Sequence, residues 1–342
     1  MQNSSVFLAV ILLFFSCTLK EKRSSEQIAA VSASFPYVEF IDDELSEIIA
    51  PGTSVEIIAE GFDWTEGPLW VEGIGLLFCD IPPNKIYRWS EQNGHELFLY
   101  PSGYTGSTPR GGEMGSNGLL LDPDGNLVLC QHGDRRLARL SASLSEPQPV
   151  YETIIDNYQG RKLNSPNDAC FDKAGNLYFT DPPYGLEKRM DDPSKELDFQ
   201  GIFRFSAGGE LDLLTDELTR PNGIAFSPDD QTLYVANSDP EKAIWMAYSL
   251  DSAGMIKDAK VFHDATSLVG SEAGLPDGLK VDKRGNIFAS GPGGIWIFNG
   301  SGKVLGKIKT GQATSNCAFG NGGTTLFITA DMYVMKVALV AS

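Results

Sequence analysis

The stretch RPNGIAFSPDDQTLYVANSD, from Arg220 to Asp239, decides the fold because its pattern returns along the chain. It consists of a tight Pro-Asn-Gly turn, an apolar run, a polar turn and a second apolar run. SPNDACFDKAGNLYFTDPP, from Ser165, and LPDGLKVDKRGNIFASGPG, from Leu275, show the same order of features. Runs such as NLYFT and TLYVA are β-branched and aromatic, which is typical of strands. Each copy therefore predicts a β-hairpin that follows a tight turn.

The hairpin occurs six times in the 342 residues. The position where each polar turn reverses the chain is held by Gly75, Gly125, Gly175, Asp230, Gly285 and Gly323. Further strand-like runs, such as KIYRW, GIFRF and GIWIF, follow the hairpins. Four strands in each of six repeats, without a helical period, predict an all-β fold, a six-bladed β-propeller.

The last repeat has room for only three strands after Asn316. SVEIIAEG, from Ser54, is strand-like and lies before the first repeat. We expect this N-terminal strand to complete the last blade, because closing the ring removes an exposed sheet edge. A solenoid built from the same repeat is the alternative, and it would need polar caps at both ends.

The N-terminal residues differ from the rest. The run VFLAVILLFFSC is too short to span a bilayer as a mature helix and is typical of a signal peptide. We expect a signal peptide at 1–16, a polar tether at 17–36 and the propeller at 37–342. Cys17 follows a small residue, as at the lipid-modified cysteine of lipoproteins, which predicts export to the periplasm or cell envelope with a membrane tether. A cleaved signal without a lipid is the alternative.

The chain is acidic, with a net charge of −18 and a pI near 4.5. Nucleic-acid binding is therefore not expected, because phosphate contacts need a basic surface. The chain has no Gly-x-Ser-x-Gly and no phosphate-binding loop motif, which disfavours Ser-His-Asp catalysis. No feature of the sequence indicates a protein partner.

One polar residue stands just before or at the start of the first strand of every repeat. These residues are Glu66, Asn117, Asn167, Asn222, Asp277 and Asn316. The first strand of each propeller blade lines the central channel, so we expect the six side chains to converge there without a Lys or Arg. Converging carboxylate and amide oxygens are costly without a cation, and they suit Ca²⁺ or Mg²⁺. Taken singly, each is also an ordinary turn residue.

The residues beside this ring support the same reading. A glycine follows four of its members, and we expect it to let the backbone bend. The second strands end near the same opening, at Asp80, His132, Asp181, Asn237, Ser290 and Asp331. His132 is expected to orient a substrate or carry a proton, with a surface loop as the alternative. Tyr184, in TDPPYGL, could form an aromatic lid or belong to a plain turn.

These motifs together resemble the gluconolactonase and regucalcin-like family, with bacterial gluconolactonases the most similar. The resemblance runs from about Val55 to the C-terminus and rests on stretches such as WTEGPLW, LLFCDIPPNKIYRW, LNSPNDACFDKAGNLYFTDPPYGL and LPDGLKVDKRGNIFASGPGGIWIF. It implies a propeller that hydrolyses a sugar lactone with a bound divalent cation, most often Ca²⁺, with Mg²⁺ and Zn²⁺ as alternatives. Regucalcin-like members carry an Arg where this chain has Ser165, which implies a different mode of sugar binding.

The resemblance also implies roles for single residues. Glu66, Asn167, Asn222 and Asp277 match the metal-binding positions, and Asp277 also matches the residue that accepts and returns a proton. Asn167 is expected to contact metal or substrate, and Asn117, His132, Asp181 and Tyr184 are expected on the substrate side. The cation would polarise the lactone carbonyl while Asp277 takes a proton from water. A phosphotriesterase of the diisopropylfluorophosphatase type and a non-catalytic calcium- or ligand-binding propeller are the alternative functions.

Overall fold

The computed structural model of the chain describes residues 35–341. The predictions of a signal peptide at 1–16 and a lipid on Cys17 lie outside the described residues, as does all but the end of the 17–36 tether. Within the described part, none of the helices is long and apolar enough to cross a membrane.

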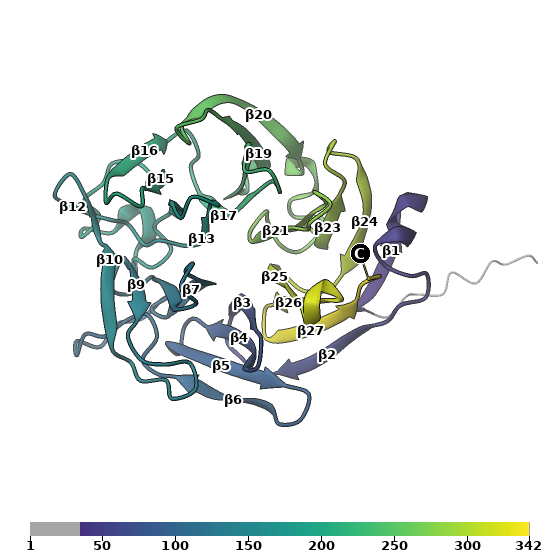
Figure 1. Cartoon of the computed structure of the whole chain (residues 1–342), viewed down its shortest axis with the longest axis horizontal. Helices are drawn as coiled ribbons and strands as arrows, with labels where there is room; N and C mark the ends of the chain where they lie inside the picture. Colours follow the sequence, from purple (N-terminus) through teal and green to yellow (C-terminus); the bar gives the residue numbers. More distant parts are fainter. Residues whose placement is uncertain (1–34, 342) are drawn as a thin grey trace, which may run out of the picture. The chain divides into compact units, whose positions relative to one another are not determined.

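Six antiparallel sheets surround a central axis (Figure 1), so the predicted six-bladed β-propeller is confirmed. Blade 1 contains β3 (Thr65–Val71), β4 (Gly75–Asp80), β5 (Lys85–Ser90) and β6 (Gly94–Leu99). Blade 2 contains β7 (Ser116–Leu121), β8 (Leu127–Gln131), β9 (Arg136–Leu140) and β10 (Tyr151–Ile155). Blade 3 contains β13 (Ala169–Phe171), β14 (Leu177–Asp181), β15 (Gly201–Phe205) and β16 (Leu211–Thr215).

The second half of the ring uses both ends of the described chain. Blade 4 contains β17 (Pro221–Phe226), β18 (Thr232–Asp239), β19 (Lys242–Leu250) and β20 (Ile256–Asp264). Blade 5 contains β21 (Leu279–Val281), β22 (Ile287–Gly291), β23 (Gly294–Phe298), β24 (Val304–Lys309) and β1 (Tyr37–Phe40). Blade 6 contains β25 (Thr314–Gly320), β26 (Thr325–Ala330), β27 (Tyr333–Ala338) and β2 (Val55–Glu60).

Short elements complete the fold. β11 (Asn157–Tyr158) and β12 (Arg161–Lys162) form a small hairpin after blade 2. The helices of the described part are single 3₁₀ turns: η1 (Asp43–Glu47), η2 (Arg189–Asp191), η3 (Thr266–Leu268) and η4 (Asn321–Gly323).

The ring is closed by β2, as the sequence predicts. β2 pairs antiparallel with β27, with Val55 opposite Val337 and Glu60 opposite Tyr333. The last blade therefore joins the two ends of the propeller in one sheet, and the edge of β27 is covered.

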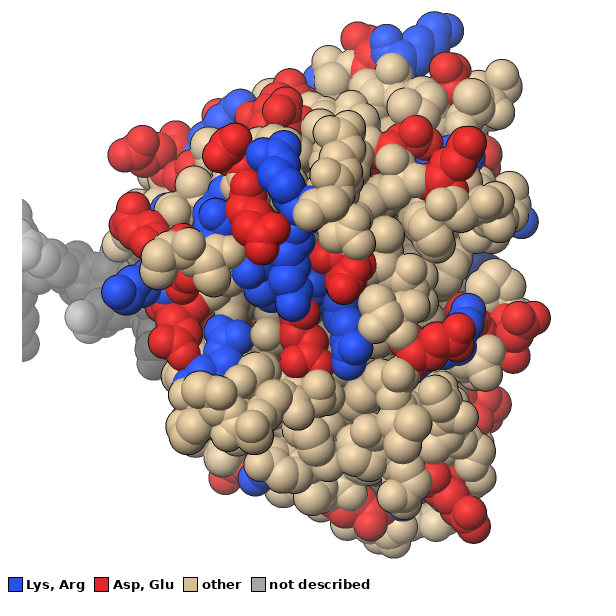
Figure 2. All heavy atoms as spheres, turned by 90° about the vertical axis from the view of Figure 1, so that its left-hand side faces the viewer, with Lys and Arg blue, Asp and Glu red and all other residues tan. Residues whose placement is uncertain are grey.

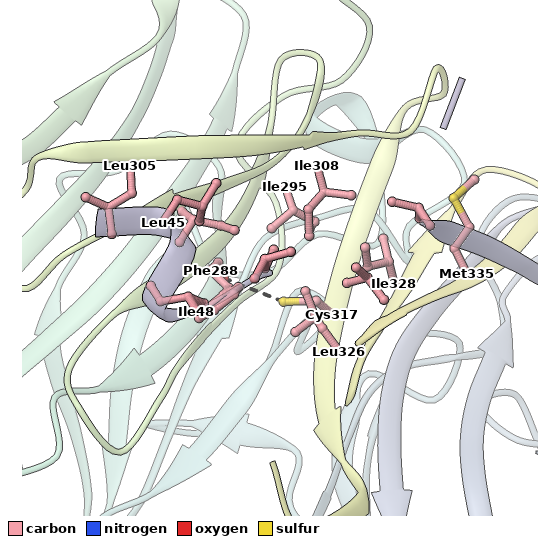
Figure 3. Close-up of a cluster of buried hydrophobic side chains, with 14 of the residues drawn as sticks. Leu45, Ile48, Phe288, Ile295, Leu305, Ile308, Cys317, Leu326, Ile328 and Met335 are labelled. Carbon is pink, nitrogen blue, oxygen red and sulfur yellow. Dashed lines mark hydrogen bonds between the residues drawn. The ribbon is translucent and has the colours of Figure 1, made fainter. Parts of the chain in front are cut away.

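The pairing of β1 with β24 was not expected from the sequence. β1 adds a fifth strand to blade 5 by pairing with β24. The chain then turns through η1, which places the buried Leu45 between blades 5 and 6 (Figure 3). Leu45 belongs to a buried cluster that also contains Phe288 and Leu305 of blade 5 and Ile328 of blade 6. The segment before β2 therefore contributes to the core that joins these two blades.

The hairpin turns explain the repeated Asp-x-x-Gly-Asn sequence. All six reversing positions have a positive φ, from 58° at Asp230 to 116° at Gly75. In the turn after β21, the Asp282 carboxylate accepts hydrogen bonds from the backbone N–H groups of Arg284 and Asn286, each at 2.8 Å. Glycine supplies the backbone conformation and the aspartate satisfies the turn's donors, so the motif encodes the hairpin locally.

Lys and Arg side chains gather on the side of the ring where β9 and β10 lie, among acidic side chains (Figure 2). On β9, Arg139 pairs with Asp122 at 2.8 Å and with Glu152 at 3.3 Å. Arg136 pairs with Asp134 at 3.0 Å. The basic groups gathered here are therefore paired with local carboxylates, of which Asp122 is buried and Asp134 is half-buried.

Candidate functional site

A cavity of about 400 Å³ opens at the hub of the propeller. The predicted residues that line it are Glu66, Asn117, Asn167, Asn222, Asp277 and Tyr184. The first five come from five different blades, each at or just before the innermost strand. The structure thus brings together five of the six ring positions. The sixth, Asn316, lies behind the cavity.

The glycines after the ring residues allow the blades to approach closely. A Cβ on Gly118 would lie 2.7 Å from the Asn167 carbonyl oxygen, and a Cβ on Gly223 would lie 2.3 Å from that of Asp277. Neither glycine has a positive φ. The strand pairing is nevertheless irregular at both glycines, between Ser116 and Leu119 and between Pro221 and Ile224, which is consistent with the expected bend. Each glycine also leaves room for the next blade's ring residue.

Gly67 and Gly278 also allow close contact with the ring residue of the next blade, but their backbone conformations differ. Gly67 does have a positive φ, of 55°, and its added Cβ would lie 2.0 Å from the Asn117 carbonyl oxygen. An added Cβ on Gly278 would lie 1.9 Å from Cγ of Asn316. The glycines that follow the ring residues thus set how close neighbouring blades come at the hub.

Four oxygen atoms of the cavity-lining residues are buried and have no hydrogen-bond partner within residues 35–341. They are Glu66 Oε1, Asn117 Oδ1, Asn167 Oδ1 and Asn222 Oδ1. Leaving a buried acceptor unsatisfied costs about 1–3 kcal/mol. The nitrogen of the Asn222 amide does have a partner, because Nδ2 donates to Ser238 Oγ at 2.9 Å. Unsatisfied carboxylate and amide oxygens around one cavity are the donor set of a hard divalent cation, so these residues fit such a cation.

The two ring carboxylates differ in access. Glu66 is 1% exposed, whereas Asp277 is partly exposed to the cavity. Burial raises the pKa of Glu66 to about 7, with the charge of Asp168 adding to the effect. The pKa of Asp277 lies well above its usual range because of burial and the charges of Glu66, Glu113 and Asp168. Positive charge between the two groups would reverse both shifts, which again fits a cation.

The candidate ligands combine carboxylate and amide oxygens. Among the residues that the structure describes, no three His, Cys, Asp or Glu side chains form a metal-binding cluster. The oxygens gathered here come from two carboxylates and three amides, so the imidazole and thiolate ligands that favour Zn²⁺ do not contribute.

Two of the residues predicted on the substrate side do not line the cavity. Asp181 is fully buried and accepts hydrogen bonds from the backbone N–H groups of Asn164, at 2.7 Å, and Ser165, at 2.8 Å. It therefore holds the turn that leads to Asn167. Other residues that end second strands act alike: Asp80 accepts from the N–H groups of Asp63 and Trp64, and Asn237 from that of Arg220.

His132 lies one layer behind the cavity. Its side chain is fully buried, and Nδ1 lies 3.7 Å from Oε2 of the cavity-lining Glu113. Burial, together with the charge of Arg110, lowers the pKa of His132 to about 3. The imidazole is therefore neutral at ordinary pH and borders the site from behind.

Two charged groups at the hub, Glu113 and Lys280, were not predicted from the sequence. Glu113 lines the cavity, and burial raises its pKa to about 7 although Arg189 lies 3.3 Å away. It comes from the irregular connection before β7, where no repeat pattern marks it. The expectation that no Lys or Arg joins the hub is also wrong. Lys280, within β21, lies 3.3 Å from Asp168; its position inside a strand-like run gave no signal.

Comparisons with known proteins agree with this geometry. Residues 64–331 match the family described as SMP-30/Gluconolactonase/LRE-like region. The chain is 43% identical to a gluconolactonase of Zymomonas mobilis over 300 residues, which cover 86% of this chain and 83% of that protein. It also superimposes on the solved gluconolactonase XC5397 of Xanthomonas campestris with a TM-score of 0.76 and 28% identity, covering 89% and 95% of the two chains. The chain therefore belongs to the SMP-30/gluconolactonase/LRE-like family.

Proposed function

We propose that this chain hydrolyses a sugar lactone and that a divalent cation bound at the hub takes part. The single observation that carries the proposal is the set of unpartnered oxygens of Glu66, Asn117, Asn167 and Asn222 around the cavity that Asp277 also lines. The 43% identity to a protein named gluconolactonase supports the reaction class.

Glu66, Asn167, Asn222 and Asp277 would hold the cation, as the family resemblance implies. When bound, the cation supplies Lewis-acid polarisation of the lactone carbonyl and stabilisation of the charge that develops on its oxygen. The oxygen-only donor set favours Ca²⁺, with Mg²⁺ as the alternative and Zn²⁺ less suited.

Of the two ring carboxylates, Asp277 is the one that a substrate can reach, because Glu66 is buried while Asp277 is partly exposed. We assign to Asp277 the removal of a proton from the attacking water. The water oxygen bonds to the carbonyl carbon, the bond from that carbon to the ring oxygen breaks, and Asp277 returns the proton to the ring oxygen. The product is the open-chain hydroxy acid.

The remaining cavity residues would bind the sugar hydroxyl groups. Asn117, Tyr184 and Glu113 line the cavity and carry polar atoms. Ser165 is turned away: its hydroxyl donates to the Pro182 carbonyl at 2.5 Å and accepts from the Gly185 N–H at 2.9 Å. The position that is Arg in regucalcin-like proteins therefore braces the loop that carries Tyr184, which supports a sugar-binding mode of a different kind.

The test measures the metal content of the purified protein and its hydrolysis of glucono-δ-lactone, before and after chelation. We expect chelation to abolish hydrolysis and added Ca²⁺ to restore it. Hydrolysis that survives complete removal of the metal would refute the role of the cation. A phosphotriester in the same assay separates the diisopropylfluorophosphatase-like alternative, and cation binding without any hydrolysis would favour the binding-only alternative.

Export of the protein is a further part of the proposal. It rests on the apolar run at 6–17 and on Cys17, both outside the described residues. Mass spectrometry of the protein isolated from its own cells would show a mature N-terminus at Cys17 with a lipid, a cleaved end without one, or the intact N-terminus that rejects export by this signal.

A further inference from the structure

A chain of side chains crosses the hub behind the cavity and ends on Glu66. Lys280 Nζ lies 3.0 Å from the carbonyl oxygen of Leu279, 3.3 Å from Asp168 Oδ2 and 3.4 Å from Asn316 Oδ1. Asn316 Nδ2 donates to Glu66 Oε2 at 3.1 Å. These groups come from blades 3, 5, 6 and 1, so the chain links the blades at the centre of the ring.

The Asn316 amide has its orientation fixed. Its oxygen accepts from the Cys317 backbone N–H at 2.9 Å and from the Lys280 ammonium. The side chain is 1% exposed, and it packs so closely against Gly278 that a Cβ there would lie 1.9–2.3 Å from the amide atoms. Two donors on the oxygen leave only the NH₂ group to face Glu66.

The two oxygens of the Glu66 carboxylate have different surroundings. Oε2 accepts from Asn316 Nδ2 and from the Gly67 backbone N–H, whereas Oε1 is buried without a partner. One oxygen is thus used to fix the carboxylate, and the other is left for the cavity. A carboxylate held by neighbouring donors presents its free oxygen to a cation without a further loss of rotational freedom.

We propose that Asn316, aligned by Lys280, is the positioning residue that directs Glu66 Oε1 toward the cation. The inference rests on the proposed function, because it assumes that Glu66 is a ligand. In this proposal Lys280 acts on Glu66 by orienting the Asn316 amide. The simpler alternative is that Lys280 acts on the site only through its positive charge. The ammonium itself is kept charged: burial lowers the pKa of Lys280, but Asp168 and other neighbouring negative groups outweigh burial and raise it.

Calcium binding to the metal-free protein, measured by calorimetry, tests the proposal independently of turnover. We expect Asn316→Leu to weaken Ca²⁺ binding about tenfold or more, because a hydrogen bond to a charged group is lost. The effect should vanish in a Glu66→Gln background, since residues that act through one another are not additive. Asn286→Leu, in the hairpin turn of blade 5, is the matched control and should bind Ca²⁺ as the parent does.

Lys280→Met separates alignment from charge. Removing a positive charge near the site favours cation binding, so a charge-only role predicts tighter Ca²⁺ binding. The alignment role predicts weaker binding, with Lys280→Arg restoring at least part of it. Tighter or unchanged binding in Lys280→Met, or additive effects of Asn316→Leu and Glu66→Gln, would overturn the proposal. The single variant Glu66→Gln tests the proposed cation site itself. If it binds Ca²⁺ as tightly as the parent does, the proposed site is overturned.

Discussion

Gly223 is the position where a single methyl group should uncouple two blades and disable the site. In Gly223→Ala the new Cβ would lie 2.3 Å from the Asp277 carbonyl oxygen and 2.6 Å from the Gly278 Cα. Both are backbone atoms of the next blade, so no side-chain rotation relieves the contact. Since real Cβ atoms keep at least 3.0 Å, the backbone at Asp277 must retreat by about 0.7 Å. The same shift breaks the 3.1 Å hydrogen bond from the Gly223 N–H to the Asp277 carbonyl.

Two effects follow and differ in size. Overpacking of this kind costs about 1–3 kcal/mol of folding free energy. A displacement approaching 1 Å at a reacting group costs about 100-fold in rate. We therefore expect Gly223→Ala to fold, with a modest loss of thermal stability, and to lose kcat/KM for glucono-δ-lactone by about 10–100-fold.

The matched control is Gly285→Ala in the outer hairpin turn of blade 5. Gly285 has a φ of 86°, and an added Cβ would meet nothing closer than Pro228 at 3.9 Å. This variant should lose about 1–2 kcal/mol through backbone strain and keep the parent's kcat/KM. Parental kcat/KM in Gly223→Ala, or an equal loss of kcat/KM in both variants, would refute the argument that blade contact positions Asp277.

Three further predictions use other parts of the molecule. Asp277→Asn should keep the thermal unfolding temperature within a few degrees and lower kcat by about 100-fold or more; hydrolysis at the parental rate would remove Asp277 as the base. Because burial lowers the pKa of His132 from 6.5 to about 3, the unfolded chain takes up a proton there that the folded protein does not. The free energy of unfolding should therefore fall as the pH decreases below 6.5, by up to about 1.4 kcal/mol per pH unit from this group. Measured by denaturant unfolding, the free energy of unfolding of His132→Gln should depend less on pH than that of the exposed control His95→Gln. Equal pH dependence in the two variants would contradict this prediction. Deletion of residues 35–60 uncovers the edge of β27 and should give a less stable, self-associating protein in size-exclusion chromatography, whereas a monomer of parental stability would show that closure by β2 is dispensable.

The sequence by itself determined the blades and their number. Each hairpin turn is encoded locally, by an Asp that satisfies the turn's donors and a Gly or Asp that accepts a positive φ. Repetition of this unit then requires closure, and only the strand before the first repeat was available to complete the last blade. The same symmetry placed Glu66, Asn167, Asn222 and Asp277 at equivalent positions, so their convergence followed from the pattern.

Only the tertiary structure decided which way the hub side chains point. Asn316 occupies the same repeat position as Asn222, yet Gly278 and Lys280 of blade 5 turn its amide toward Glu66 and away from the cavity. Glu113 enters from a connection without repeat character, and β1 pairs through a short strand with no distinctive pattern. A repeat fixes the backbone position of each residue, but a side chain's direction depends on contacts from other blades, which sequence spacing does not specify.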